Sequence, residues 1–214
     1  MVGAAKKPLR ILAIGSSSTE GVGASAPGFA YPAQLQVDLA AALGGAVTVE
    51  NAGVGGETVA TTLARLKAAV KAEKPDLLIW QVGTNDAVRG DDETHFRAYV
   101  EEGVSIVADA KIPLVLLDPQ YFPAIRDLAQ YERYVRIIRD IGAKHRAPVF
   151  SRYMMMKEWG AESLPLLRAM LSKDAFHMSD RGYGCLAQNL AAELAPLWRP
   201  IDVAEKPTEA RPRP

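Results

Sequence analysis

The sequence predicts an α/β fold in which helices cover both faces of a parallel sheet. Short apolar segments alternate with longer segments whose apolar residues recur every three or four positions, which is typical of strands alternating with amphipathic helices. Residues 76–82 are almost continuously apolar, as expected of a strand that is buried on both faces. With 214 residues, 49% of them hydrophobic, the chain can bury one sizeable core. We expect a single domain over residues 1–200 and a flexible, proline-containing tail over residues 201–214.

Two strand–helix units are expected in the first part of the chain. The first unit is a short apolar strand over residues 9–14 and a helix over residues 31–43, whose leucines recur at every fourth position. The second unit is a strand over residues 47–51 and a helix over residues 58–74, which Pro75 ends.

The same alternation continues to the end of the predicted domain. Further strands are expected over residues 76–82, 113–117 and 148–150. Helices are expected over residues 93–110, residues 128–145, most of residues 154–171, and residues 180–197.

Composition and charge argue against several classes of protein. Because 25 basic residues balance 25 acidic ones, no overall field favours nucleic acid or an anionic membrane. No run approaches the roughly 18 apolar residues of a membrane-spanning helix. The apolar run after Lys6 and Lys7 is too short for a signal peptide. An exported protein that has lost its leader would give the same sequence, so the compartment is not predicted. The sequence also gives no prediction of the oligomeric state.

Asp174 and His177 give the strongest indication of chemistry. Two side chains three residues apart in one turn project in the same direction. The carboxylate can therefore accept a hydrogen bond from one ring nitrogen and leave the other nitrogen free to act as a base. His95 and His145 lie near helix ends and are expected to be structural or solvated. Only His177 combines a carboxylate three residues earlier with a loop setting.

Three loops that follow predicted strands supply groups on which this base could act. Ligands of open parallel sheets bind beyond the carboxyl ends of the strands. Ser17, in the first loop, becomes a nucleophile if a base reaches its hydroxyl, and otherwise only caps the next segment. Gly56, in the second loop, is either a turn glycine or a close backbone N–H donor. Asn85, in the third loop, either caps the loop or donates to a developing oxyanion.

Other mechanisms do not fit these spacings. The first loop has no lysine, which excludes a phosphate-binding P-loop, and it does not continue into a dinucleotide-binding fingerprint. Thr19 stands where the nucleophile elbow of α/β-hydrolases has its second glycine. No cluster of histidine, cysteine and carboxylate residues has the spacing of a metal site. We therefore expect no metal and no organic cofactor.

Together these short blocks resemble the SGNH hydrolases, the GDSL-type esterase superfamily. The blocks occur in the family's order, with Ser17, then Gly56 after Asn51, then Asn85, then His177 preceded by Asp174. The resemblance implies a flavodoxin-like, three-layer α/β/α fold with a five-stranded parallel sheet in the order 2-1-3-4-5. It also implies a catalytic triad of Ser17, His177 and Asp174, and an oxyanion hole formed by the Ser17 and Gly56 N–H groups and the Asn85 amide.

One departure from the family pattern concerns the first loop. The usual Gly-Asp-Ser-Leu is replaced by Gly15-Ser16-Ser17-Ser18, so an uncharged, shorter side chain stands where the family has an aspartate. The triad keeps its own carboxylate, Asp174. The orientation of the first loop is left open.

The resemblance implies a serine esterase that hydrolyses carboxylic esters of small molecules or carbohydrates. The short loops of a 214-residue chain leave little room for a lid over the site, so we expect a preference for short, acetyl-like acyl groups. Two alternatives remain at this stage: an acyltransferase that uses the same site with an alcohol or sugar acceptor, and a non-catalytic binding module. Tyr121, Phe122 and Met155 are candidates for an acyl pocket, although they could equally be core residues. We expect no nucleic-acid partner.

Overall fold

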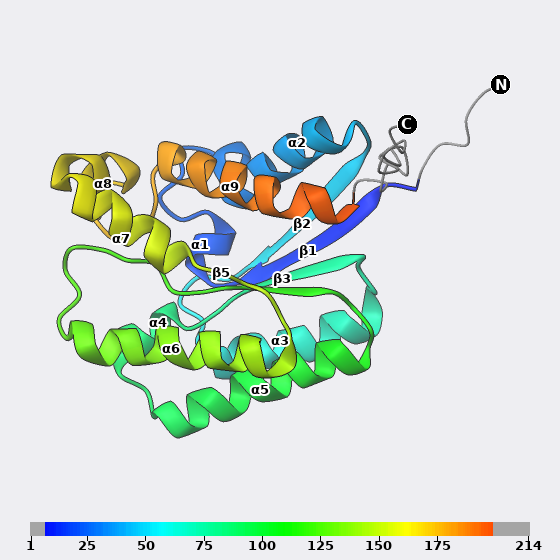
Figure 1. Ribbon diagram of the computed structural model, residues 1–214, viewed down its shortest axis with the longest axis horizontal. Helices are drawn as coiled ribbons and strands as arrows, with labels where there is room; N and C mark the ends of the chain where they lie inside the picture. Colours follow the sequence, from blue (N-terminus) through cyan, green and yellow to red (C-terminus); the bar gives the residue numbers. More distant parts are fainter. Residues whose placement is uncertain (1–6, 199–214) are drawn as a thin grey trace, which may run out of the picture.

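Five parallel strands form one sheet in the order β2-β1-β3-β4-β5 in the computed structural model, which describes residues 7–198 (Figure 1). The strands are β1 (Leu9–Gly15), β2 (Val47–Gly53), β3 (Leu77–Gln81), β4 (Leu114–Leu117) and β5 (Val149–Phe150). Each neighbouring pair is parallel; β1 pairs with both β2 and β3, and β3, at the centre of the sheet, pairs with β1 and β4. The predicted fold class and the strand order are confirmed.

Helices cover both faces of this sheet and give the predicted three layers. In Figure 1, α2 and α9 lie together above the sheet, whereas α3, α5 and α6 lie below it. The helices are α1 (Ser17–Glu20), η1 (Pro27–Phe29), α2 (Tyr31–Leu43), α3 (Val59–Ala72), α4 (Thr84–Arg89), α5 (Glu93–Asp109), α6 (Leu128–His145), α7 (Arg152–Glu162), α8 (Leu164–Met170) and α9 (Asp180–Trp198).

The core lies between the sheet and these two helical layers. All five residues of β3 are buried, which explains why this strand shows no alternation of polar and apolar residues. Trp80 of β3 is fully buried against α5, where a Cβ on Gly103 would lie 2.4 Å from the indole ring. Glycine at position 103 therefore lets α5 approach the sheet closely.

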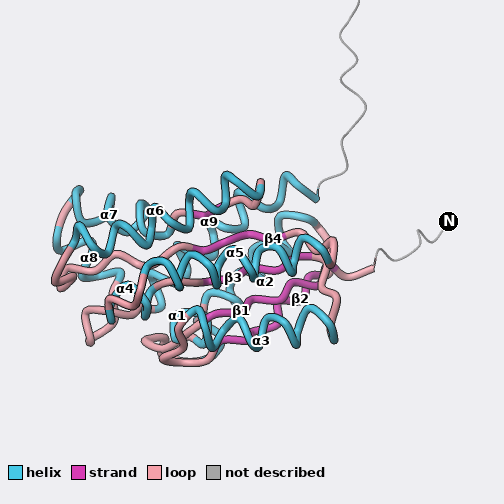
Figure 2. The backbone as a smooth tube through the Cα atoms, turned by 90° about the horizontal axis from the view of Figure 1, so that it is seen from below, coloured by secondary structure: helices cyan, strands magenta, loops and turns pink. Residues whose placement is uncertain are grey.

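Two short helices stand where loops were expected. Helix α1 begins two residues after the end of β1, and α4 begins three residues after the end of β3. At four and six residues they are too short to show a helical period in the sequence. Gly21 and Gly83, both in the left-handed region at φ 104° and 94°, end α1 and precede α4. Both helices lie at the end of the sheet where the strands finish (Figure 2).

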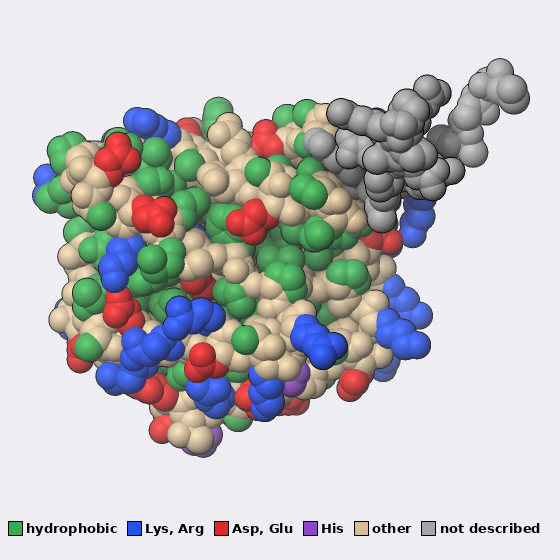
Figure 3. Space-filling model, in the orientation of Figure 1, with side chains coloured by type: hydrophobic (Ala, Val, Ile, Leu, Met, Phe, Trp, Pro, Cys, Tyr) green, Lys and Arg blue, Asp and Glu red, His purple; other side chains and the backbone are tan. Residues whose placement is uncertain are grey.

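The surface agrees with the balanced composition. Basic and acidic side chains are interspersed over the lower helices on the face shown in Figure 3. Among residues 7–198, no helix is both long enough and apolar enough to cross a membrane. Cys185 of α9 is a partly buried free cysteine. The expected tail at residues 201–214 lies outside the described residues, and the domain limits stay a prediction.

Candidate active site

The candidate nucleophile lies at the junction of β1 and α1. Ser17 is the first residue of α1 and is 9% exposed. The backbone N–H at such a position has no partner within its own helix, so it is available to a ligand. The Oγ of Ser17 lies 2.9 Å from Nε2 of His177, 160 positions later in the chain. The fold thus brings the predicted base into hydrogen-bond contact with the predicted nucleophile.

Asp174 holds the opposite side of the same imidazole ring. Its Oδ2 lies 2.6 Å from Nδ1 of His177. Its Oδ1 accepts hydrogen bonds from the Ser172 hydroxyl (2.7 Å) and from the backbone N–H groups of Phe176 and His177 (both 2.9 Å). Burial would raise the pKa of Asp174, but these hydrogen bonds outweigh it and hold the pKa well below its usual range. The carboxylate is therefore an anion wherever the imidazole can act as a base.

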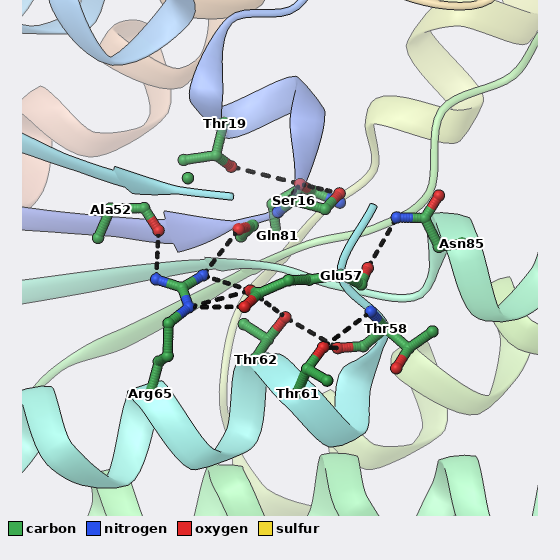
Figure 4. Close-up of polar contacts among 12 residues, drawn as sticks. Ser16, Thr19, Ala52, Glu57, Thr58, Thr61, Thr62, Arg65, Gln81 and Asn85 are labelled. Atoms are coloured by element: carbon green, nitrogen blue, oxygen red, sulfur yellow. Dashed lines mark hydrogen bonds and ion pairs between the residues drawn. The ribbon is translucent and has the colours of Figure 1, made fainter. Parts of the chain in front are cut away.

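The second and third loops meet each other beside Ser17. A Cβ on Gly55 would lie 4.0 Å from Cβ of Ser17, so the second loop passes next to the nucleophile. Gly56 has φ 78° and open space around it, so this position requires glycine for its backbone conformation. Asn85, in α4, donates one amide N–H to the carbonyl oxygen of Glu57 at 2.7 Å (Figure 4). A primary amide has two N–H groups, and the second is available to a ligand.

Gln81 settles the orientation of the first loop, which the sequence left open. Its Oε1 accepts hydrogen bonds from the Ser16 backbone N–H (2.8 Å), the Ser16 hydroxyl (3.0 Å) and the Thr19 hydroxyl (3.3 Å) (Figure 4). Ser16 is therefore anchored to β3 through a short neutral contact. Gln81 could have been identified in the sequence as the one amide side chain in an otherwise apolar strand, because a buried amide needs hydrogen-bond partners.

Gln120 is a second residue that sequence reasoning missed. It follows β4 and is fully buried. It accepts a hydrogen bond from the Ser18 hydroxyl and donates one to the carbonyl oxygen of Phe176, both at 2.8 Å. It thus joins the neighbour of the nucleophile to the neighbour of the base. Its position at the carboxyl end of a parallel strand was the signal that could have identified it.

A hollow of about 410 Å³ lies beside Phe176. Phe122, one of the three predicted pocket residues, lines it and packs edge-to-face on Phe176 with ring centroids 4.7 Å apart. Tyr121 instead packs on Tyr153, and Met155 is partly buried against the core. The remaining lining residues come from α4, from the segment that leads into α6 and from the start of α6: Ala87, Val88, Ala124, Ile125, Arg126, Asp127, Gln130 and Tyr131.

The other two histidines lie away from these loops. His95 is in the first turn of α5, with Nδ1 3.5 Å from Asp92 and its side chain 78% exposed. His145 is the last residue of α6 and lines a hollow with Leu77 and Pro113, at the end of the sheet where β3 begins. Between residues 7 and 198, no group of three or more histidine, cysteine, aspartate or glutamate residues could hold a metal ion.

Two buried carboxylates follow strands β3 and β4, at positions 86 and 118. Asp86 accepts a hydrogen bond from the backbone N–H of Val59 at the start of α3. Asp118 accepts hydrogen bonds from the backbone N–H of Tyr153 and from the Ser151 hydroxyl. Burial raises the pKa of each carboxylate to about 6, although these hydrogen bonds partly oppose the shift.

We expect these two carboxylates to make the folded chain less stable as the pH rises. Their pKa is near 6 in the folded state and near 3.8 when unfolded, so the folded state binds the proton more tightly. The stabilisation is complete below about pH 4 and is lost as the pH rises through 6, at a cost of up to about 3 kcal/mol per carboxylate. Urea unfolding at pH 4.5, 5.5 and 7 measures this loss, which should be smaller in Asp86→Asn. The same slope in Asp86→Asn and in the exposed control Asp109→Asn would contradict the assignment.

Known proteins resemble this chain in sequence and in fold. The model of the Non-GDSL lipase-like family matches residues 2–196. An arylesterase from Vibrio mimicus is 25% identical over 157 residues, which cover 69% of this chain and 70% of that protein. Esterase TesA from Pseudomonas aeruginosa is 26% identical over 157 residues, with 70% of each chain covered. The crystal structure of a lipase/acylhydrolase from Enterococcus faecalis is 27% identical, with a TM-score of 0.73, and the match covers 88% of this chain and 96% of that one.

Proposed function

Because this chain belongs to the Non-GDSL lipase-like family and is a carboxylic ester hydrolase of the SGNH type, we propose that it cleaves short-chain esters through an acyl-enzyme on Ser17. The observation that carries this proposal is the continuous chain of hydrogen bonds from Ser17 Oγ to His177 Nε2 (2.9 Å) and from His177 Nδ1 to Asp174 (2.6 Å). A serine, a base and an orienting carboxylate in this order are the parts that acyl transfer requires.

In the proposed first step, His177 Nε2 removes the Ser17 proton as Oγ attacks the ester carbonyl carbon. The carbonyl oxygen becomes an oxyanion, which accepts hydrogen bonds from the N–H groups of Ser17 and Gly56 and from the Asn85 amide. Each such donor is worth on the order of 3–4 kcal/mol in acyl transfer. Asp174 holds the proton on Nδ1 and stabilises the imidazolium that forms.

In the second step the tetrahedral intermediate collapses and the bond to the alcohol oxygen breaks. His177 returns its proton to that oxygen, which leaves as the alcohol and leaves Ser17 acylated. His177 then deprotonates a water molecule that attacks the acyl carbon. As this second intermediate collapses, the bond between the acyl carbon and Ser17 Oγ breaks, His177 returns its proton to Oγ, and the acid leaves. The chain's own residues supply every proton transfer in both steps.

The hollow beside Phe176 supports a preference for short acyl groups. Val88, Phe122 and Ile125 give it apolar walls, but Arg126 and Asp127 also line it. A long alkyl chain in this hollow would take water from the two charged side chains, which costs free energy unless they find other partners. An acetyl or butyryl group can use the apolar wall alone. Small-molecule and carbohydrate esters of such acids are therefore the proposed substrates.

A series of p-nitrophenyl esters tests this proposal. We expect kcat/KM to be highest for acyl chains of about two to four carbons and to fall for longer chains, because longer chains meet the charged lining. We also expect one equivalent of a fluorophosphonate to label Ser17, as identified by peptide mass spectrometry. A maximum at eight or more carbons would contradict the acyl preference, and failure to label Ser17 would contradict the acyl-enzyme. New esters formed when alcohols are added would instead indicate acyl transfer to those acceptors.

A further inference from the structure

Glu57 connects the two loops that carry the proposed oxyanion donors. It directly follows Gly56, and its backbone carbonyl oxygen accepts the hydrogen bond from the Asn85 amide at 2.7 Å. The position of Glu57 therefore influences both the Gly56 N–H and the direction in which the remaining Asn85 N–H points. The Glu57 side chain, 14% exposed, points away from this carbonyl toward α3 (Figure 4).

Arg65 of α3 holds that side chain in a two-point ion pair. Its Nε lies 2.9 Å and 3.0 Å from the two carboxylate oxygens of Glu57, and a terminal nitrogen lies 2.5 Å from one of them. The hydroxyl of Thr62 donates to the same carboxylate at 3.2 Å. Such a planar, two-point contact fixes the relative orientation of both partners more strictly than a point charge can.

The same guanidinium also contacts the ends of two strands. It donates to the carbonyl oxygen of Ala52 at 2.8 Å and to that of Gly15 at 3.1 Å. Gly15 is the last residue of β1, two positions before Ser17, and Ala52 belongs to β2, just before the second loop. One side chain thus touches the first and second loops directly and reaches the third through Glu57. Each of these loops supplies one of the proposed oxyanion donors.

We propose that the Glu57–Arg65 ion pair is a positioning element that sets the geometry of the oxyanion hole. This inference rests on the proposed function and adds the residues that orient its transition-state donors. Arg65 acts through other groups, because the carboxylate of Glu57 balances its charge and its donors point to the protein's own oxygens. Loss of Arg65 would therefore loosen the Gly56 and Asn85 donors and leave the hydrogen bonds between Ser17, His177 and Asp174 in place.

The test compares Arg65→Met, Arg65→Lys and the unchanged chain with p-nitrophenyl acetate, with kcat expressed per serine that a fluorophosphonate titrates. In Arg65→Met we expect kcat to fall about 10- to 100-fold while KM changes less than about threefold, since misplaced donors weaken the transition state more than the bound ester. Arg65→Lys should recover only part of the rate, because an ammonium group cannot reproduce the planar, two-point contact of the guanidinium with the Glu57 carboxylate. If Arg65→Met does not fold, Glu57→Gln replaces it, with a smaller loss in the same direction.

A double-mutant cycle separates positioning from general stabilisation. If Arg65 acts through the donors, Arg65→Met should cost less activity in an Asn85→Ala background than in the unchanged chain. Arg133→Met is the matched control, because it breaks an exposed ion pair with Glu93 between α5 and α6, and its kcat should not change. An unchanged kcat in Arg65→Met would overturn the inference. So would a double variant whose fold-loss in kcat equals the product of the two single-variant losses, because the two residues would then act independently. Full activity in Ser17→Ala would instead overturn the proposed function itself.

Discussion

Ser17→Ala is expected to hydrolyse p-nitrophenyl acetate about 10⁴- to 10⁶-fold more slowly than the unchanged chain. The variant has no hydroxyl to attack the ester, and His177 Nε2 loses the hydrogen bond that it shares with Ser17 at 2.9 Å. The residual rate should come from ester binding and the oxyanion donors alone. Initial rates measured over a range of ester concentrations give this comparison directly.

The fold should survive this substitution. Ser17 begins a helix, where alanine is well tolerated, and its side-chain contact is with His177 and not with the core. The midpoint of thermal unfolding should therefore stay within a few degrees of the original. Ser105→Ala, on α5, is the matched control and should keep full activity. Equal turnover by Ser17→Ala and the unchanged chain would falsify the assignment of the nucleophile.

Asp174→Asn is expected to lower kcat by about 10³- to 10⁴-fold. The Oδ2 of Asp174 lies 2.6 Å from His177 Nδ1, and a carboxylate there requires Nδ1 to carry the proton. An asparagine whose NH₂ group faces Nδ1 would favour the opposite tautomer, with its proton on Nε2 and no lone pair for the Ser17 hydroxyl. The loss should appear in kcat, because the ester does not contact this carboxylate in the proposed mechanism.

The structure favours this orientation of the asparagine. The Oδ1 of Asp174 accepts three hydrogen bonds, two of them from backbone N–H groups, so the remaining oxygen of asparagine should keep that position. Its NH₂ group is then directed at the imidazole. Asp109→Asn, at the exposed end of α5, serves as the control and should be fully active. A kcat for Asp174→Asn within threefold of the original would show that this carboxylate does not orient the base.

Short-range patterns predicted most of the fold. The limits of α2 and α6 agree with the predicted helices, because a long helix repeats its apolar face several times. Helices α1 and α4 were missed because they are shorter than two turns. The strand order was predicted from the family resemblance and is confirmed. The residues of a single strand do not by themselves determine which strands pair with it.

The i, i+3 spacing of a carboxylate and a histidine does not by itself identify the candidate active site. Asp92 and His95 have the same spacing as Asp174 and His177, and their side chains also approach each other, at 3.5 Å. They lie on an exposed helix start, however, whereas the His177 imidazole contacts Ser17. The spacing predicts that a carboxylate and an imidazole can pair. Only the three-dimensional arrangement shows what the other ring nitrogen faces.

By itself, the sequence determined the alternation of strands and helices and the Asp174–His177 pair, because these features depend on residues within a few positions of each other. The tertiary structure alone decided the partners of Gln81, Gln120 and Arg65. Each of these residues has a hydrogen-bond partner 50 to 102 positions away, as between Arg65 and Gly15 and between Gln120 and Ser18. Such contacts arise from the order in which the strands assemble, because that order brings the carboxyl ends of distant strands to one edge of the sheet.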